Sequence, residues 1–219
     1  MRPRGAGLVS VVLAAWLCAA AVVAAAWDAD RLTQAAQRLG PRAVASAGPL
    51  RSLIGQAGAA VADEERLDLV NQFFNRRVLF RDDAQVWGQV DHWASPLETL
   101  NRGEGDCEDY AIAKYFALLS AGVAPVRLRL VYVRAQLAGA SQAHMVLAYY
   151  PDPAAEPLIL DNLVTEVRPA SRRPDLTPVF SFNAEGLWQG VAGASAGDPA
   201  ARLSRWREVL VKARAEGFL

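Results

Sequence analysis

Apolar residues follow one spacing in the earlier part of the chain and another in the later part. In the earlier part they recur every three or four positions, as on one face of a helix. This spacing predicts helices over residues 28–39 and 61–79, and a third from Asp106 to about residue 121. The stretch 43–58, which is rich in Ala, Gly and Ser, predicts a loop or a short helix.

The later part of the chain has the partly alternating pattern of half-buried strands. Strands are predicted over residues 126–133, 143–150, 157–161 and 178–183. The turn Pro151-Asp152-Pro153 favours an antiparallel pairing of the second and third strands. Asp198-Pro199 then starts a last amphipathic helix, predicted over residues 199–215. Helices first and strands later predict an α+β fold.

Residues 81–98 fit neither pattern and are expected to be irregular. Trp87, Trp93 and Pro96 lie in this stretch. We favour a loop that packs on the domain through its tryptophans, and direct contact with a substrate is the alternative.

The helix predicted from Asp106 has almost no polar face between Ala111 and Leu119, which is typical of a helix buried at the centre of a domain. Asp106 is a good N-cap, and Gly122 is a suitable stop. We therefore expect a buried central helix packed against the antiparallel sheet. Cys107 would lie in its first turn.

Residues 1–26 have the composition of a secretory signal peptide. Arg2 and Arg4 precede an uncharged run from Leu8 to Ala26, and small residues end this run at a suitable cleavage site. An uncleaved membrane anchor is the alternative, because the run approaches the roughly 20 residues that span a bilayer. Either way, the rest of the chain is expected in an exported, oxidising compartment.

Residues 27–219 suffice for a single domain, with its core expected at about residues 60–190. The chain has 23 Lys and Arg residues and 23 Asp and Glu residues, so without Arg2 and Arg4 the counts are 21 and 23, a net charge of −2. Because no basic cluster stands out, we expect no nucleic-acid partner.

Cys107 is the one cysteine left when the segment containing Cys18 is removed. A lone thiol in an oxidising compartment is typically kept for its chemistry. A helix N-terminus favours the nucleophilic thiolate, but the flanking acids Asp106, Glu108 and Asp109 oppose it. A bound Ca²⁺, which takes carboxylate ligands, would offset these charges. Asp109 is equally well explained as a residue that complements the helix dipole.

A nucleophilic cysteine also needs a base, and the chain has two histidines, His92 and His144. His144 lies on a predicted strand, where a histidine by itself is more often structural. Asp161 ends the next strand, and antiparallel pairing would place it beside His144 to orient the ring. The combination of Cys107, His144 and Asp161 predicts a catalytic triad more strongly than any one of them alone.

The chain resembles the bacterial transglutaminase-like cysteine proteinases of the papain-related superfamily. Cysteine on a helix N-terminus, histidine on one strand and aspartate on the next is the order found in that superfamily. The strings that carry the resemblance, which extends over about residues 60–190, are Trp93–Leu100, Gly105–Tyr115, Ala143–Leu147, Leu158–Asn162 and Pro178–Asn183.

The resemblance implies a papain/transglutaminase-like core in which Cys107 is the nucleophile, His144 the base and Asp161 its orienting partner. Asp106 and Glu108 match the acids that hold Ca²⁺ in the family. The implied activity is a periplasmic endopeptidase that cleaves the N-terminal region of a large outer-membrane-associated adhesin at an Ala-Ala-type site and promotes biofilm dispersal. The implied regulator is the periplasmic domain of an inner-membrane cyclic di-GMP receptor, which sequesters the protease.

Two other functions fit the same residues. A protein transglutaminase would use the same triad but pass the acyl group to an amine. A non-catalytic binding module would keep Cys107 as a buried structural thiol.

Overall fold

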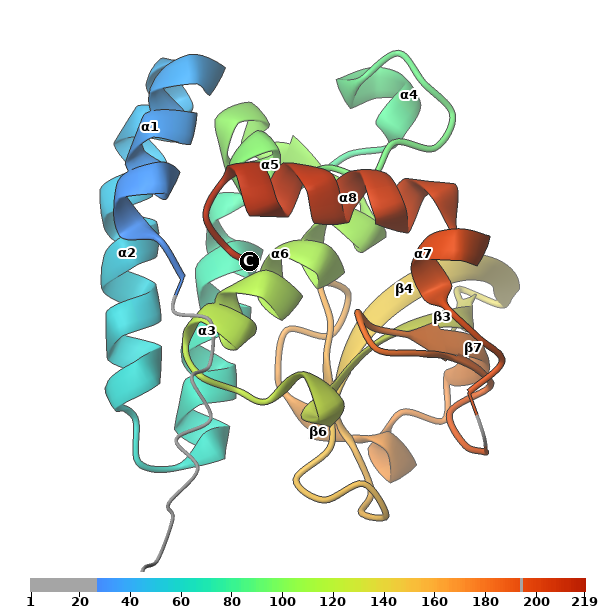
Figure 1. Ribbon diagram of the computed structural model, residues 1–219. Helices are drawn as coiled ribbons and strands as arrows, with labels where there is room; N and C mark the ends of the chain where they lie inside the picture. The colour runs from blue at the N-terminus through green and yellow to red at the C-terminus, as the bar shows by residue number, and fades with distance from the viewer. Residues whose placement is uncertain (1–26, 194) are drawn as a thin grey trace, which may run out of the picture.

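The computed structural model describes residues 27–193 and 195–219. Helices lie on one side of the molecule and a sheet on the other, with helix α6 between them (Figure 1). The predicted α+β fold is therefore confirmed. The predicted signal peptide, residues 1–26 with Cys18, lies outside the described residues. Within the described part, no helix has the length and apolar character needed to cross a membrane.

Three helices form the N-terminal side: α1 (Ala29–Leu39), α2 (Pro41–Ala59) and α3 (Asp63–Arg77). The helices predicted over residues 28–39 and 61–79 are confirmed as α1 and α3. The expectation of a loop or short helix over 43–58 is wrong, because α2 is one helix of 19 residues that continues through Pro49. Its small and aliphatic side chains recur at helical spacing and are buried against α1, α3 and α5, and this packing outweighs the poor helix propensity of Gly and Pro.

The stretch predicted to be irregular contains the short helix α4 (Asp83–Val86), a loop and the start of a second helix, α5 (Pro96–Arg102). Ser95 begins α5 with a capping box, in which its side chain accepts from the Glu98 amide and the Glu98 side chain accepts from the Ser95 amide. Strand β1 (Leu79–Phe80) pairs in parallel with β2 (Glu104–Gly105), and Asp106 alone separates β2 from the start of α6. These contacts hold both flanks of the loop.

Helix α6 (Cys107–Ser120) is the central element. It packs against α2, α3 and α5 on one side and against β3 and β4 on the other. Ten of its residues are buried, from Asp109 to Leu118, as its apolar sequence predicts. Cys107 is thus fixed at the end of a helix that the whole core holds in place.

The main sheet has the strand order β6-β5-β4-β3-β7-β8, and all of its neighbouring strands are antiparallel. The predicted pairing of the second and third strands is confirmed, with Leu147 opposite Leu160. The strands are β3 (Leu128–Leu137), β4 (Ala140–Tyr149), β5 (Leu158–Leu160), β6 (Arg168–Pro169), β7 (Leu176–Phe182) and β8 (Leu187–Gln189).

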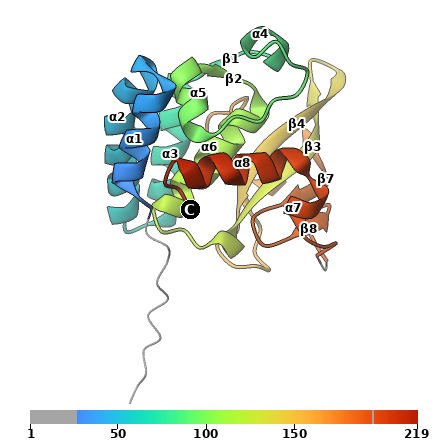
Figure 2. The same cartoon turned by 45° about the horizontal axis from the view of Figure 1, so that its top comes forward.

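The predicted C-terminal helix is divided at Leu203 into α7 (Pro199–Arg202) and α8 (Ser204–Ala215). Helix α8 reaches from the helical side to the sheet, as the turned view shows (Figure 2). Its Trp206 is fully buried, stacked on Phe116 of α6 with ring centroids 5.8 Å apart and edge-on to Phe182 of β7. The last helix therefore joins the two layers.

Candidate active site

A cavity of about 490 Å³ lies where the start of α6 meets β4. Cys107 and His144 both line it, so the structure brings the predicted nucleophile and base to one space. Aromatic side chains complete much of the wall, namely Phe80, Trp93, Tyr132 and Phe180. Trp93 in this wall also stacks on Phe182, with centroids 5.7 Å apart, so the tryptophan both packs on the core and faces the cavity.

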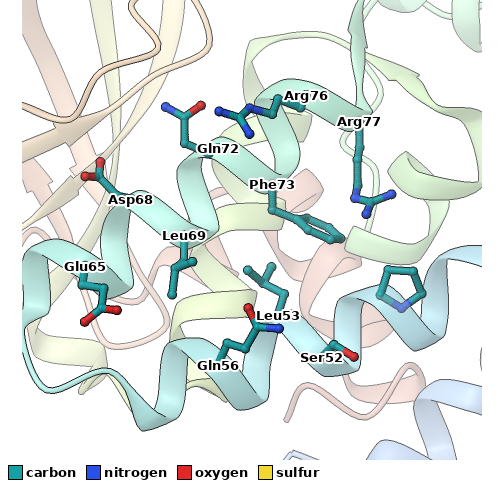
Figure 3. Close-up of a pocket in the computed structure, with 11 residues that line it drawn as sticks. Ser52, Leu53, Gln56, Glu65, Asp68, Leu69, Gln72, Phe73, Arg76 and Arg77 are labelled. Carbon is teal, nitrogen blue, oxygen red and sulfur yellow. The ribbon is translucent and has the colours of Figure 1, made fainter.

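A larger, more open groove of about 930 Å³ lies between α2 and α3 (Figure 3). Leu53, Leu69 and Phe73 form its apolar part, while Glu65 and Asp68 lie toward one end and Arg76 and Arg77 toward the other. Among the described residues, none of those that line this groove is a cysteine or a histidine. We therefore place the chemistry in the smaller cavity.

Cys107 is the first residue of α6 and is partly buried. Burial raises the pKa of its thiol, and the negative charges of Glu108 and Asp106 raise it further. Glu108 is the closer of the two, since its Oε2 accepts a hydrogen bond from the thiol at 2.8 Å. A hydrogen bond from the Met145 amide lowers the pKa of the thiol, but by less. The charge conflict anticipated from the sequence is thus present.

His144 and Asp161 form a buried pair across β4 and the end of β5. His144 Nε2 lies 2.8 Å from Asp161 Oδ1, and the two residues are 3% and 1% exposed. Because an ionised carboxylate only accepts hydrogen bonds, Nε2 carries a proton in this contact, and in a neutral ring Nδ1 is then the acceptor. The antiparallel pairing brings these two residues together as the sequence predicts.

Asp161 stays ionised although it is buried. Burial by itself raises its pKa, but hydrogen bonds from His144, the Leu163 amide and Arg173 outweigh this and lower the pKa to about 2. Arg173 and Lys114, whose Nζ donates to the Asp161 carbonyl at 3.1 Å, were not found from the sequence. Neither has a sequence signal, because each reaches Asp161 only through the folding of distant segments.

Acidic side chains cluster beside Cys107. Oxygens of Asp83, Asp106 and Asp109 lie within 4.8 Å of one another, and so do oxygens of Asp83, Asp91 and Glu108. Sequence reasoning pointed to Asp106 and Glu108 as ligands and left Asp109 open, but it missed Asp83 and Asp91. Those two come from α4 and the loop after it, where no spacing pattern relates them to α6.

The acidic cluster suits a hard divalent cation. One buried oxygen each of Asp83, Asp106 and Asp109 has no hydrogen-bond partner among the described residues. Burial, followed by the charges of Glu108, Asp109 and Asp83, raises the pKa of Asp106 to about 10. Asp106 occupies the N-cap position as predicted, but its carboxylate makes no cap bond with any described residue. Its Oδ1 is therefore available to a cation such as Ca²⁺.

Comparison with known proteins identifies relatives of this chain. Residues 55–176 match the family described as bacterial transglutaminase-like cysteine proteinase. None of the curated proteins compared with the chain matches it. Two solved structures of Legionella pneumophila LapG are similar: the EGTA-treated form, with TM-score 0.74 over 85% of this chain and 98% of that one, and the calcium-bound form, with TM-score 0.73 over 84% and 98%. Both are 37% identical in sequence to this chain.

Proposed function

Because the chain belongs to the bacterial transglutaminase-like cysteine proteinase family, we propose that it is a Ca²⁺-dependent cysteine endopeptidase with Cys107, His144 and Asp161 as its triad. The observation that carries the triad is one cavity lined by both Cys107 and His144, with His144 Nε2 lying 2.8 Å from Asp161 Oδ1.

The proposed reaction is acyl transfer to water. His144 Nδ1 takes the thiol proton, and the Cys107 sulfur attacks the scissile carbonyl to form a C–S bond. The imidazolium then gives its proton to the amine as the C–N bond breaks. Asp161 stabilises the charged ring, and amides at the start of α6 can stabilise the oxyanion. A water molecule, deprotonated by His144, hydrolyses the thioester and frees the enzyme.

The cation is proposed to be Ca²⁺, held by Asp106 and Glu108 together with Asp83, Asp91 and Asp109. Support comes from the unpartnered buried oxygens and from the similarity to a calcium-bound LapG. When bound, the ion supplies the positive charge that this acidic cluster lacks and lowers the cost of ionising the neighbouring thiol.

The proposed substrate is the N-terminal region of a large surface adhesin, cleaved at an Ala-Ala-type site. We place the enzyme in the periplasm and propose that an inner-membrane cyclic di-GMP receptor sequesters it. The family resemblance and the composition of residues 1–26 support these assignments.

The test uses the Ca²⁺-loaded protein and the N-terminal region of the large adhesin made by the same bacterium. We expect cleavage by the wild type and none by Cys107→Ala or His144→Gln, with circular dichroism showing that both variants are folded. Iodoacetamide should label Cys107 in the wild type. Full cleavage by Cys107→Ala would overturn the proposal.

Two further measurements, of amine incorporation and of thiol reactivity, separate the alternative functions. Incorporation of a labelled amine into a glutamine-containing protein, without peptide-bond cleavage, would indicate a transglutaminase. An unreactive thiol and no turnover of either kind would indicate a binding module.

A further inference from the structure

Arg173 is a buried arginine held between two carboxylates. It follows the short 3₁₀ turn Ala170–Arg172, and its side chain is 2% exposed. Its Nη2 lies 2.7 Å from Asp161 Oδ2 and 2.7 Å from Asp175 Oδ2, and its Nε donates to Asp175 Oδ1 at 3.0 Å. Such a pair of ionic contacts fixes the guanidinium plane.

This arginine contacts the pair from outside the catalytic cavity. Among the described residues, those that line the catalytic cavity do not include Arg173. It lines instead a separate, mostly apolar cavity of about 220 Å³ on the reverse face of the sheet, with Val131, Val146 and Ile159. Arg173 is therefore not part of the wall around Cys107.

The two oxygens of the Asp161 carboxylate have different partners. Oδ1 accepts from His144 Nε2 and from the amides of Asn162 and Leu163, at 2.8, 2.7 and 3.1 Å. Oδ2 accepts from Arg173. Because a guanidinium stays charged at every pH at which the protein is folded, Arg173 is a permanent cation that balances the buried Asp161 charge.

We propose that Arg173 is a positioning residue, which holds Oδ2 of Asp161 so that Oδ1 stays turned toward His144, and the imidazole then keeps its proton on Nε2 and presents Nδ1 to Cys107. This inference rests on the proposed function, because it assigns the acceptor nitrogen of that reaction. Asp175 takes part indirectly, since it balances the second side of the guanidinium and holds it in place.

Loss of Arg173 has a definite chemical consequence. Oδ2 of Asp161 would lose its arginine partner, and the carboxylate could then turn away from His144 Nε2. The proton of the neutral ring would no longer be fixed on Nε2, and in the fraction that carries it on Nδ1 the ring cannot accept the thiol proton. The other charged or titratable groups around the pair are Lys114 on α6, Cys107 and Glu108 in the cavity and Asp175 on the reverse face.

The test compares Arg173→Met and Arg173→Lys with the wild type. Arg168→Met is the matched control, because Arg168 lies on the same edge of the sheet but pairs with exposed Glu166 and does not contact Asp161. The protein is labelled with ¹⁵N-histidine, and the ring nitrogens are observed by NMR between about pH 6 and pH 9. The sequence holds two histidines, so a His92→Gln spectrum assigns the His144 signals.

We expect the Nε2–H tautomer at His144 in the wild type and in Arg168→Met. In Arg173→Met, the Nδ1–H form should increase, and kcat should fall at least about tenfold with KM within about twofold, because a wrong-tautomer histidine costs far more than this in comparable triads. Arg173→Lys keeps the positive charge but not the planar guanidinium with its several donors, so its tautomer ratio and its kcat should lie between those of the wild type and Arg173→Met.

An unchanged tautomer and an unchanged kcat in folded Arg173→Met would overturn the inference. If Arg173→Met does not fold, the same two readouts on Arg173→Lys decide. The NMR measurement needs no substrate, so it judges Arg173 even if Cys107→Ala still cleaves and the proposed function itself fails.

Discussion

Lys114, a lysine with no exposed surface, lies beneath the His144–Asp161 pair. Its Nζ donates to the Asp161 carbonyl and lies 5.5 Å from the centroid of the Tyr110 ring. Asn75 donates to the same carbonyl at 2.8 Å, so this oxygen keeps a partner without the lysine. Burial lowers the pKa of Lys114 to about 7, although the charge of Asp161 opposes this. A buried amine of this kind makes stability depend on pH.

Replacement of Lys114 by Met should remove that dependence. The folded pKa of about 7 lies below the ordinary value of 10.5, so the unfolded chain binds more protons between these pH values. The buried lysine lowers the free energy of unfolding by its full amount below pH 7. This destabilisation decreases as the pH rises toward 10.5, by up to about 1.4 kcal/mol per pH unit. In urea unfolding at about pH 7 and pH 9, the wild type should gain about 2 kcal/mol relative to Lys114→Met. Parallel stability curves would contradict this.

At the scale of elements, the junction of β2 with α6 is packed closely against the loop after α4. Asp109 Oδ1 accepts from the Ala94 amide at 2.8 Å, which ties the first turn of α6 to that loop. A Cβ at Gly105 would lie 2.7 Å from Asp109 Oδ2, so only glycine allows this approach. The loop therefore brings Asp83 and Asp91 to the helix start, and a bound cation would join these elements.

Calcium should consequently raise the thermal stability of the protein. At a free concentration about 100 times its Kd, one bound ion contributes about 2.7 kcal/mol, which corresponds to a Tm increase of roughly 5–10 °C. Differential scanning calorimetry with Ca²⁺ and with excess EGTA measures this increase. Asp83→Asn and Asp106→Asn should reduce it, whereas Asp82→Asn, at an exposed neighbouring position, should keep it. Equal Tm values with Ca²⁺ and EGTA would count against the cation site.

At the scale of the whole molecule, residues 216–218 contact both the start of α1 and the start of α5. The Asp28 amide donates to the Gly217 carbonyl at 2.7 Å. Glu216, after α8, is buried and accepts hydrogen bonds from the Ser95 hydroxyl and, at 3.1 Å, from the Leu97 amide at the start of α5. Phe218 is 3% exposed in the main core. The C-terminus is thus part of the structure that supports the site.

Deletion of residues 216–219 should destabilise the whole domain by about 3 kcal/mol or more, because it removes a core phenylalanine and leaves polar groups at the start of α5 unpaired. Thermal unfolding should show a Tm lower by roughly 6–12 °C. Glu216→Gln is the control: burial raises the pKa of Glu216 to about 8, so at pH 7 the carboxyl is mostly protonated and the amide resembles it. If the Gln variant lost as much stability as the deletion, the explanation from packing would be wrong.

The sequence by itself determined the features that depend on near neighbours. The apolar run after Asp106 specified a buried helix with Cys107 at its start, and the Pro151–Pro153 turn specified the pairing that joins His144 to Asp161. Helical or strand spacing and a tight turn are local, so they can be read from one sequence.

Only the tertiary structure decided the rest. Helix α2 depends on burial against its neighbours, which outweighs its glycines and Pro49. Asp83 reaches the acids beside Cys107 through an irregular loop, and Arg173 reaches Asp161 from a turn on the reverse face of the sheet. These partners meet because a common core fixes the positions of separate segments. Contacts between separate segments produce no spacing pattern in the sequence, so the sequence alone does not predict them.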